Sequence, residues 1–166
     1  MTNPIAEKLA EEHRDIDAGI AAFKAASAAD AVAAQGLARA LAALRRHIYI
    51  EEQLLFPPLR SGRAFGAIMA MLREHGEMWP LLDKLESLVA SGSGDAGVVG
   101  LLAELEKLLL AHNDKEEKTV YGDADAVIKG EAAGELLAFA ASGTLPAGWK
   151  CERIAGGAKP PFGPRK

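Results

Sequence analysis

Four histidines are the residues of this 166-residue chain whose type and spacing are best suited to chemistry: His13, His47, His75 and His112. Two of them have a glutamate four residues later, since Glu51 follows His47 and Glu116 follows His112. On a helix that turns by about 100° per residue, such a glutamate lies about 40° around the axis from its histidine, one turn along. Each pair therefore directs an imidazole and a carboxylate into one volume, and these groups bind transition-metal ions.

Each histidine falls on the apolar stripe of the helix predicted around it. His13, for example, lies between Leu9 and Ile16, and the other three histidines occupy corresponding positions at steps of three or four residues. Side chains at this spacing share the buried face of a helix, so we expect all four imidazoles in a helix-bundle core. By the same geometry, Glu52 and Glu117 come five residues after a histidine and lie about 140° away from it, so they are expected to face outward.

The pattern His…His-x-x-x-Glu occurs twice in the chain. Its first copy uses residues 13, 47 and 51 and its second uses residues 75, 112 and 116, at offsets of 75 − 13 = 62, 112 − 47 = 65 and 116 − 51 = 65. Measured from the predicted turns, the histidines stand at the same height to within about 1.5–3 Å. Two such halves packed face to face predict a pseudo-twofold site with a pair of metal positions.

The elements that must position these residues are helices. Ala, Leu, Glu, Lys and Arg dominate the chain, and β-branched residues are sparse. We predict an all-α, up-down-up-down four-helix bundle with helices over about 3–27, 30–56, 61–90 and 98–120, the second ended by Pro57 and Pro58. One or two short helices over 123–130 and 131–141 and an irregular Gly/Pro-rich tail, packed at Trp149, are expected to follow. The predicted division is a metal-binding bundle over 1–122 and a C-terminal extension over 123–166.

Six ionisable groups in one core layer indicate a metal centre, because each buried group costs several kcal/mol unless it is paired or bound to a metal. Two octahedral ions offer about twelve positions, of which four imidazoles, two bridging carboxylates and one oxo or hydroxo bridge fill about ten. Nitrogen and carboxylate ligands with open positions favour iron, with manganese or zinc as alternatives. We therefore predict two iron ions with an oxo or hydroxo bridge, bound by His13, His47, Glu51, His75, His112 and Glu116.

This constellation resembles the hemerythrin family, specifically its HHE cation-binding domain. The resemblance covers about residues 5–122 and includes the segment Glu51–Pro57, which is similar to the end of the family's second helix. It implies a non-haem di-iron centre with an oxo-type bridge that binds O2 or related small ligands. The oxygen carriers of the family have a further histidine where this chain has Trp79, and an aspartate at the position of Glu117. Which glutamate bridges is therefore open, and the helical angle favours Glu116.

The absent fifth histidine favours sensing, storage or detoxification over oxygen carriage. The expected function is binding of O2, NO, peroxide or iron itself, and the alternatives are a di-iron enzyme that turns over peroxide or NO and a metal-free helical interaction protein. A formal net charge of -4 without a basic block argues against a nucleic-acid partner. We expect no membrane span, because no apolar run is long enough, and a cytoplasmic location, because no export signal is visible. The oligomeric state is not specified by the sequence.

Five further residues carry expectations of their own. Tyr49 and Tyr121 are expected at the surface or an interface, with hydrogen bonding to the metal ligands as the alternative. Trp79 either fills the core or lines a ligand pocket. Cys151 is expected to be a passive thiol, with redox sensing or metal ligation as alternatives. Glu12 is expected on a solvated face.

Overall fold

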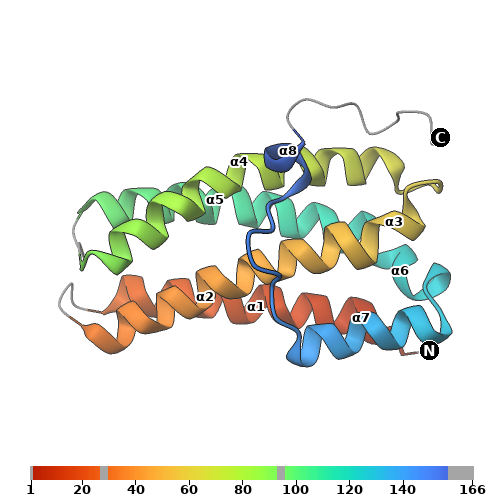
Figure 1. Cartoon of the computed structure of the whole chain (residues 1–166), viewed down its shortest axis with the longest axis horizontal. Coiled ribbons are helices and arrows are strands. Elements are labelled where there is room, and N and C mark those ends of the chain that lie inside the picture. The colour runs from red at the N-terminus through yellow and green to blue at the C-terminus, as the bar shows by residue number, and fades with distance from the viewer. Residues whose placement is uncertain (1, 27–29, 93–95, 157–166) are drawn as a thin grey trace.

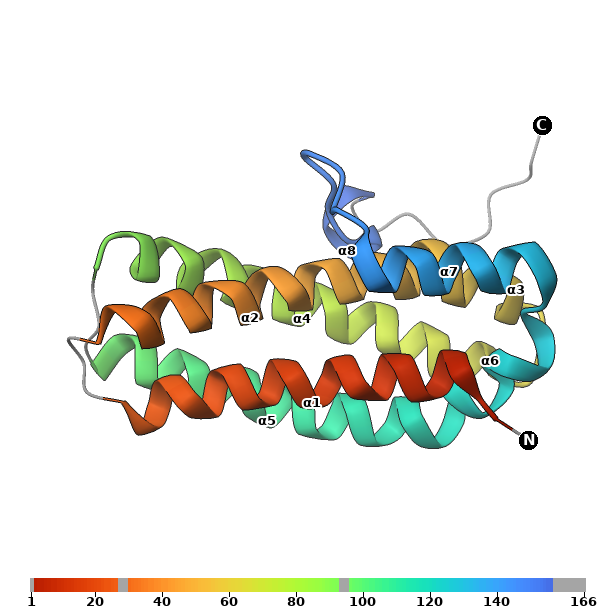
Figure 2. The ribbon, with the colours of Figure 1, turned by 90° about the horizontal axis from the view of Figure 1, so that it is seen from below.

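The computed structural model describes residues 2–26, 30–92 and 96–156, and these residues form helices without a strand. Four of the helices are long: α1 (Pro4–Ala25), α2 (Ala31–Ile50), α4 (Phe65–Ala90) and α5 (Ala96–Thr119). Figures 1 and 2 show them packed lengthwise, with the end of α1, the start of α2, the end of α4 and the start of α5 at the same end of the molecule. The predicted all-α helical bundle is confirmed.

The second long helix does not end where the sequence predicts. After α2 the chain continues through one π-helical turn, η1 (Glu51–Leu55), into α3 (Phe56–Leu59). The prediction that Pro57 and Pro58 end this helix is wrong. The π turn shifts the register so that both prolines fall in the first turn of α3, where a missing backbone N–H group is tolerated.

The other predicted boundaries lie close to the observed ones. The third long helix, α4, begins at Phe65 rather than near residue 61, because residues 60–64 form turns in which the N–H of Gly62 donates to the carbonyl of Leu59 at 3.1 Å. The fourth, α5, begins two residues earlier than the predicted residue 98. The predicted end of the first helix, at residue 27, lies outside the described residues.

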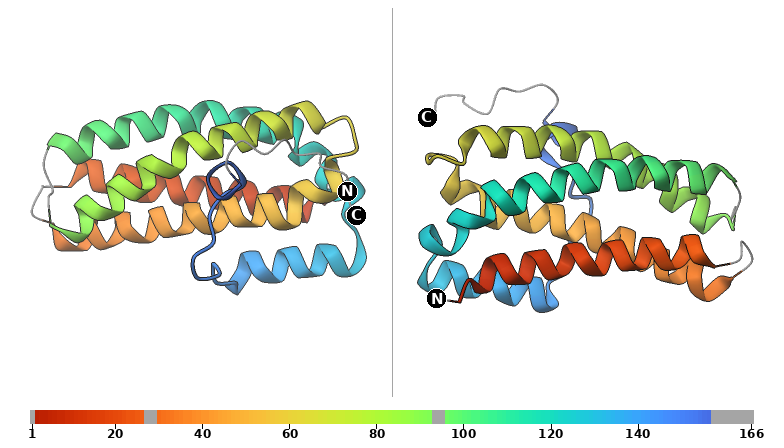
Figure 3. Two further views of the ribbon diagram at one scale, coloured as in Figure 1. Left: turned by 45° about the horizontal axis from the view of Figure 1, so that its top comes forward. Right: turned by 180° about the vertical axis from the view of Figure 1, so that it is seen from behind.

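The C-terminal segment forms two short helices, as predicted, and then crosses the bundle. The short helices are α6 (Tyr121–Val127) and α7 (Gly130–Ser142), and the chain then passes over α2 and forms α8 (Glu152–Ala155) against α4 (Figures 1 and 3). The ring of Trp149 makes edge contacts with those of Tyr49 and Trp79, at centroid distances of 5.1 and 5.6 Å. The tail is therefore packed at Trp149 as expected, while α8 was not predicted and residues 157–166 lie outside the described part.

The interior consists of two apolar clusters with a polar layer between them. One cluster, which includes Leu41 and Leu82, lies toward the end of the bundle where α1 is followed by α2. The other, which includes Phe56 and Leu72, lies toward the opposite end, near α6. In the described part of the chain, every buried acidic or histidine residue belongs to the site between these clusters: Glu12, His13, His47, Glu51, Glu52, His75, His112 and Glu116. The bundle therefore surrounds one ionisable layer with hydrocarbon above and below it.

None of the described helices combines the length and the apolar composition that a bilayer crossing requires. This agrees with the expectation that no segment spans a membrane. The cytoplasmic location, the exclusion of nucleic acid and the domain division near residue 122 stay predictions.

Candidate metal centre

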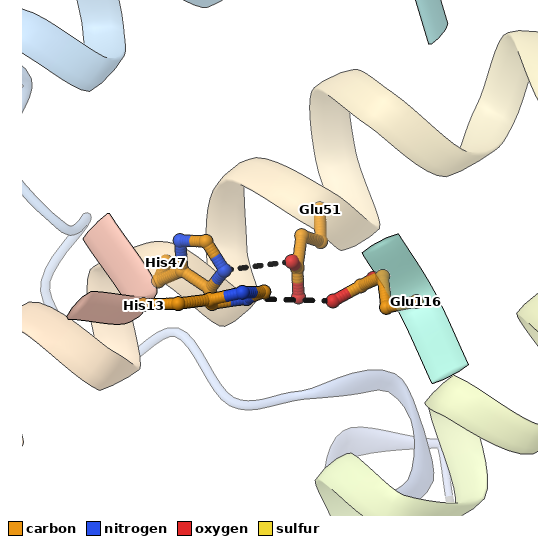
Figure 4. A group of neighbouring side chains, drawn as sticks. All are labelled: His13, His47, Glu51 and Glu116. Atoms are coloured by element: carbon orange, nitrogen blue, oxygen red, sulfur yellow. Dashed lines mark ion pairs between the residues drawn. The ribbon is translucent and has the colours of Figure 1, made fainter. Parts of the chain in front are cut away.

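The structure brings all six predicted ligand residues together in the middle of the bundle. Potential ligand atoms lie within 4.8 Å of one another in two groups, which share one glutamate. Figure 4 shows the first group, in which side chains from α1, α2, η1 and α5 converge. We call the first group position one (His13, His47, Glu51 and Glu116) and the second group position two (Glu51, His75 and His112).

Both central carboxylates lie between the two positions. The Oε1 atom of Glu51 is 2.7 Å from Nε2 of His47, and its Oε2 atom is 3.1 Å from Nε2 of His75. The Oε2 atom of Glu116 lies 3.6 Å from Nε2 of His13 and 3.5 Å from Nε2 of His112. Each glutamate therefore faces one histidine of each position, which is the placement that a bridging ligand requires.

The π turn changes which glutamates point inward. In a π turn each residue advances less around the helix axis than in an α-helix, and η1 begins at Glu51. Both Glu51 and its neighbour Glu52 are buried as a result, so the expectation that Glu52 faces outward is wrong. Glu51 faces the centre of the site, whereas Glu52 accepts a hydrogen bond from Nδ1 of His75, on the side of that ring that faces away from the centre.

Each of the four imidazoles donates its Nδ1–H to a separate glutamate at 2.8 Å. The pairs are His13 with Glu117, His47 with Glu12, His75 with Glu52, and His112 with Glu74. Because a carboxylate can only accept, these bonds place the ring proton on Nδ1 and leave the lone pair of Nε2 directed at the centre. Carboxylates in this position orient a metal-binding histidine and raise its basicity.

Like Glu52, Glu12 and Glu117 overturn or modify an expectation, and Glu74 was assigned no role from the sequence. Glu12, expected on a solvated face, is only 6% exposed and also accepts from Arg46 at 2.9 Å. Glu117 is 44% exposed, in keeping with an outward position, but its carboxylate returns to His13. The repeat indicates these partners in the sequence, because they are related by the same offsets as the ligands. Glu74 follows Glu12 by 74 − 12 = 62 residues, and Glu117 follows Glu52 by 117 − 52 = 65.

Tyr121 lies inside the site, so the expectation of a surface or interface position is wrong. Its side chain is 3% exposed, and its hydroxyl donates to Oε1 of Glu51 at 2.8 Å. The same oxygen lies 3.1 Å from Nε2 of His13 and 3.2 Å from Nε2 of His47. The hydroxyl thus contacts three of the potential ligand atoms of position one.

Helix α6, which begins with Tyr121, is anchored at both sides. The carboxylate of Asp125 accepts two backbone N–H groups in the first turn of α1, each at 3.0 Å. The Nε–H of Arg63 donates to Asp123 at 2.8 Å and ties α6 to the turn before α4. These long-range contacts fix the direction of Tyr121, which explains why a local reading of the sequence misplaced it.

Three other residues agree with the simpler expectation. Trp79 packs in the apolar cluster with the Arg45 guanidinium 4.2 Å from its ring centroid, which favours a core-filling role over that of a pocket wall. Cys151 is fully buried, and burial raises the pKa of its thiol to about 12, which is in keeping with a passive thiol. Tyr49 is half-buried between the rings of Phe139 and Trp149.

Without a metal, protons bind at the centre. Burial by itself lowers the pKa of His47, but the charge of Glu51 and the hydrogen bonds with Glu12 and Glu51 outweigh it and raise the pKa to about 10. Burial is likewise outweighed at His112, mainly by the Glu116 carboxylate 3.5 Å away and by the hydrogen bond with Glu74, and its pKa is also about 10. Burial opposes ionisation of Glu51, yet the charge of His47 and hydrogen bonds hold its pKa well below the ordinary value. The metal-free site therefore holds imidazolium–carboxylate pairs.

The donor set fits a pair of cations. Among the described residues, four buried atoms at the centre have no hydrogen-bond partner: Glu51 Oε2, His75 Nε2, and both carboxylate oxygens of Glu116. A buried polar atom without a partner costs about 1–3 kcal/mol, and cations between these atoms would satisfy all four. Imidazole nitrogen with carboxylate oxygen suits iron, manganese or zinc.

Comparison with known proteins adds one match. Neither the curated proteins nor the solved structures that were searched contain a match to this chain. A family model described as the hemerythrin HHE cation binding domain matches residues 5–124. This range includes the six predicted ligands, the four glutamates that bind the Nδ1 atoms of the histidines, and Tyr121. With this match over most of its length, the chain belongs to the hemerythrin family as an HHE cation-binding domain.

Proposed function

We propose that the chain is a non-haem di-iron protein that binds a small ligand such as O2, NO or peroxide, or stores iron itself, in a sensing, storage or detoxification role. The observation that carries this proposal is the placement of Glu51, whose two oxygens face His47 in position one and His75 in position two. A single structural ion has no need of a carboxylate between two groups of ligands. The proposed ligands are His13, His47, Glu51, His75, His112 and Glu116.

The chain prepares the site for small molecules in three ways. The glutamates bound to Nδ1 hold each imidazole in a fixed orientation. The apolar clusters on either side exclude water, and the hydroxyl of Tyr121 donates to Glu51. A bound pair of iron ions supplies open coordination positions and a reversible change of oxidation state. Four imidazoles, two shared glutamates and one bridge leave about two of the roughly twelve positions of an octahedral ion pair open, which supports binding of an added ligand.

A metal count tests this proposal first. After expression in iron-replete medium, we expect two iron ions per chain by mass spectrometry, removal by a chelator, and recovery on reloading. His75→Ala serves as the test variant and Glu104→Ala, an exposed glutamate on α5, as the control. A metal content well below one ion per chain in the wild-type protein would favour the metal-free interaction protein.

An enzyme is the second candidate, because the coordination positions that the six residues leave open would also admit a substrate. Steady-state assays separate the two functions. A binding protein changes its absorption spectrum once per site when O2, NO or peroxide is added. An enzyme removes many equivalents of peroxide or NO per site when a reductant is present.

A further inference from the structure

The pseudo-twofold relation of the two halves extends to one pair of aromatic rings. Tyr121 follows Phe56 by 121 − 56 = 65 residues, the offset that relates Glu51 to Glu116. The ring of Phe56 stacks on His75 at a centroid distance of 5.9 Å and an angle of 11°, and that of Tyr121 stacks on His13 at 5.5 Å and 20°. The two rings are therefore counterparts, and only the one beside position one carries a hydroxyl group.

The hydroxyl of Tyr121 has the spacing of a metal ligand. Two atoms bound at right angles to one cation, with bonds of about 2.1 Å, lie about 3 Å apart. The oxygen of Tyr121 lies 2.8 Å from Oε1 of Glu51, 3.1 Å from Nε2 of His13 and 3.2 Å from Nε2 of His47. A cation that these three atoms bind would also lie within reach of the Tyr121 oxygen.

We propose that the Tyr121 oxygen is a further ligand in position one, and that Phe56 leaves position two as the open position where an exogenous ligand binds. This inference rests on the proposed di-iron function. Coordination replaces the hydroxyl proton by the cation, and the proton leaves to solvent. A surface pocket is lined by Tyr121 and by Glu117, the glutamate bound to His13, and so lies next to position one. The two positions thus differ in ligand number although the chain around them repeats.

The chain offers a matched control, because it contains only two tyrosines. The other one, Tyr49, packs against Phe139 and Trp149. A phenolate bound to ferric iron absorbs visible light and gives characteristic ring vibrations in resonance Raman spectra. Such a signal in this protein must come from Tyr49 or Tyr121, and Tyr49→Phe decides between them.

The experiment compares the iron-loaded, oxidised wild-type, Tyr121→Phe and Tyr49→Phe proteins, with iron counted on each sample. We expect phenolate vibrations in the wild-type and Tyr49→Phe proteins and their loss in Tyr121→Phe. Two iron ions per chain without phenolate vibrations in the wild-type protein would overturn the inference and leave the di-iron function intact. Absence of iron would overturn both. The wild-type and Tyr49→Phe spectra decide the matter even if Tyr121→Phe fails to fold.

Azide, a small anionic probe for iron, tests where the open position lies. We expect one azide per wild-type chain, because position two alone is open. In Tyr121→Phe both halves present a phenylalanine, so we expect two. Two azide ions per wild-type chain, none, or an unchanged stoichiometry in Tyr121→Phe would overturn the assignment of position two as the open one.

Discussion

The Nδ1 atom of His47 lies 2.8 Å from Oε2 of Glu12, and the other carboxylate oxygen of Glu12 accepts from Arg46 at 2.9 Å. The glutamate is therefore held from both sides and fixes the ring that faces Glu51. A carboxylate in this relation contributes to metal binding although it does not touch the metal, because it sets the orientation and basicity of the imidazole.

Replacement of Glu12 by glutamine should weaken iron binding about 10–100-fold, the range found when such partners of ligating histidines are removed. Competition with a chelator of known affinity measures the effect. The matched control is Glu11→Gln, since Glu11 is the adjacent exposed glutamate and pairs only with Lys8 among the described residues. Equal iron affinity in the two variants would contradict the role assigned to Glu12.

Loss of the shared carboxylate should affect both positions, whereas loss of a histidine should affect one. We expect Glu51→Ala to bind less than one iron ion per chain and His75→Ala to retain about one, because position one keeps all its residues. The metal content by mass spectrometry and the helicity by circular dichroism are measured on the same samples. Two iron ions in Glu51→Ala would show that the carboxylate does not connect the positions.

The helical periodicity and the repeat were sufficient to predict the bundle and to bring six residues into one layer. Hydrophobic spacing reports which face of a helix is buried, and a histidine on that face must enter the core. The offsets of 62 and 65 residues predicted that the two halves meet. Both inferences depend on regular helices, and they hold where the helices are regular.

The prediction missed residues whose direction depends on irregular or distant structure. Glu52 turns inward because of a π turn, which leaves no mark on the hydrophobic pattern. Tyr121 is directed by α6, whose position is set by a cap between Asp125 and the start of α1, far away in the sequence. The sequence nevertheless relates Tyr121 to Phe56 by the 65-residue offset of the repeat, and Glu74 to Glu12 by its 62-residue offset.

The metal-free protein should lose stability above pH 6.5. The pKa of His47 and that of His112 rise from 6.5 to about 10 on folding, so their contribution is fully present below pH 6.5 and disappears as the pH rises through about 10. The lowered pKa of Glu51 acts in the opposite direction: its contribution is present above its ordinary value of 4.5 and is lost as the pH falls. These groups place the most stable range at about pH 4.5–6.5.

Thermal unfolding of the chelator-treated protein as a function of pH measures this effect, and the iron-loaded protein is the control. Iron takes the place of the protons, so the loaded protein should not show the same decline, and its iron affinity should rise with pH. A melting temperature of the metal-free protein that stays constant between pH 6.5 and 10 would contradict the protonated pairs assigned to the centre.

The cap on α1 should stabilise the fold and hold Tyr121 in place. Asp125 accepts the N–H groups of Ile5 and Ala6, and loss of such a cap costs about 0.5–2 kcal/mol of unfolding free energy. We expect Asp125→Ala to lose this amount in urea unfolding and to weaken the phenolate signal of the iron-loaded protein, because α6 carries Tyr121. Asp114→Ala is the control, since Asp114 is an exposed aspartate that pairs with Lys118 on the surface of α5. An Asp125→Ala protein with the stability and the spectrum of Asp114→Ala would refute the anchoring role of α6.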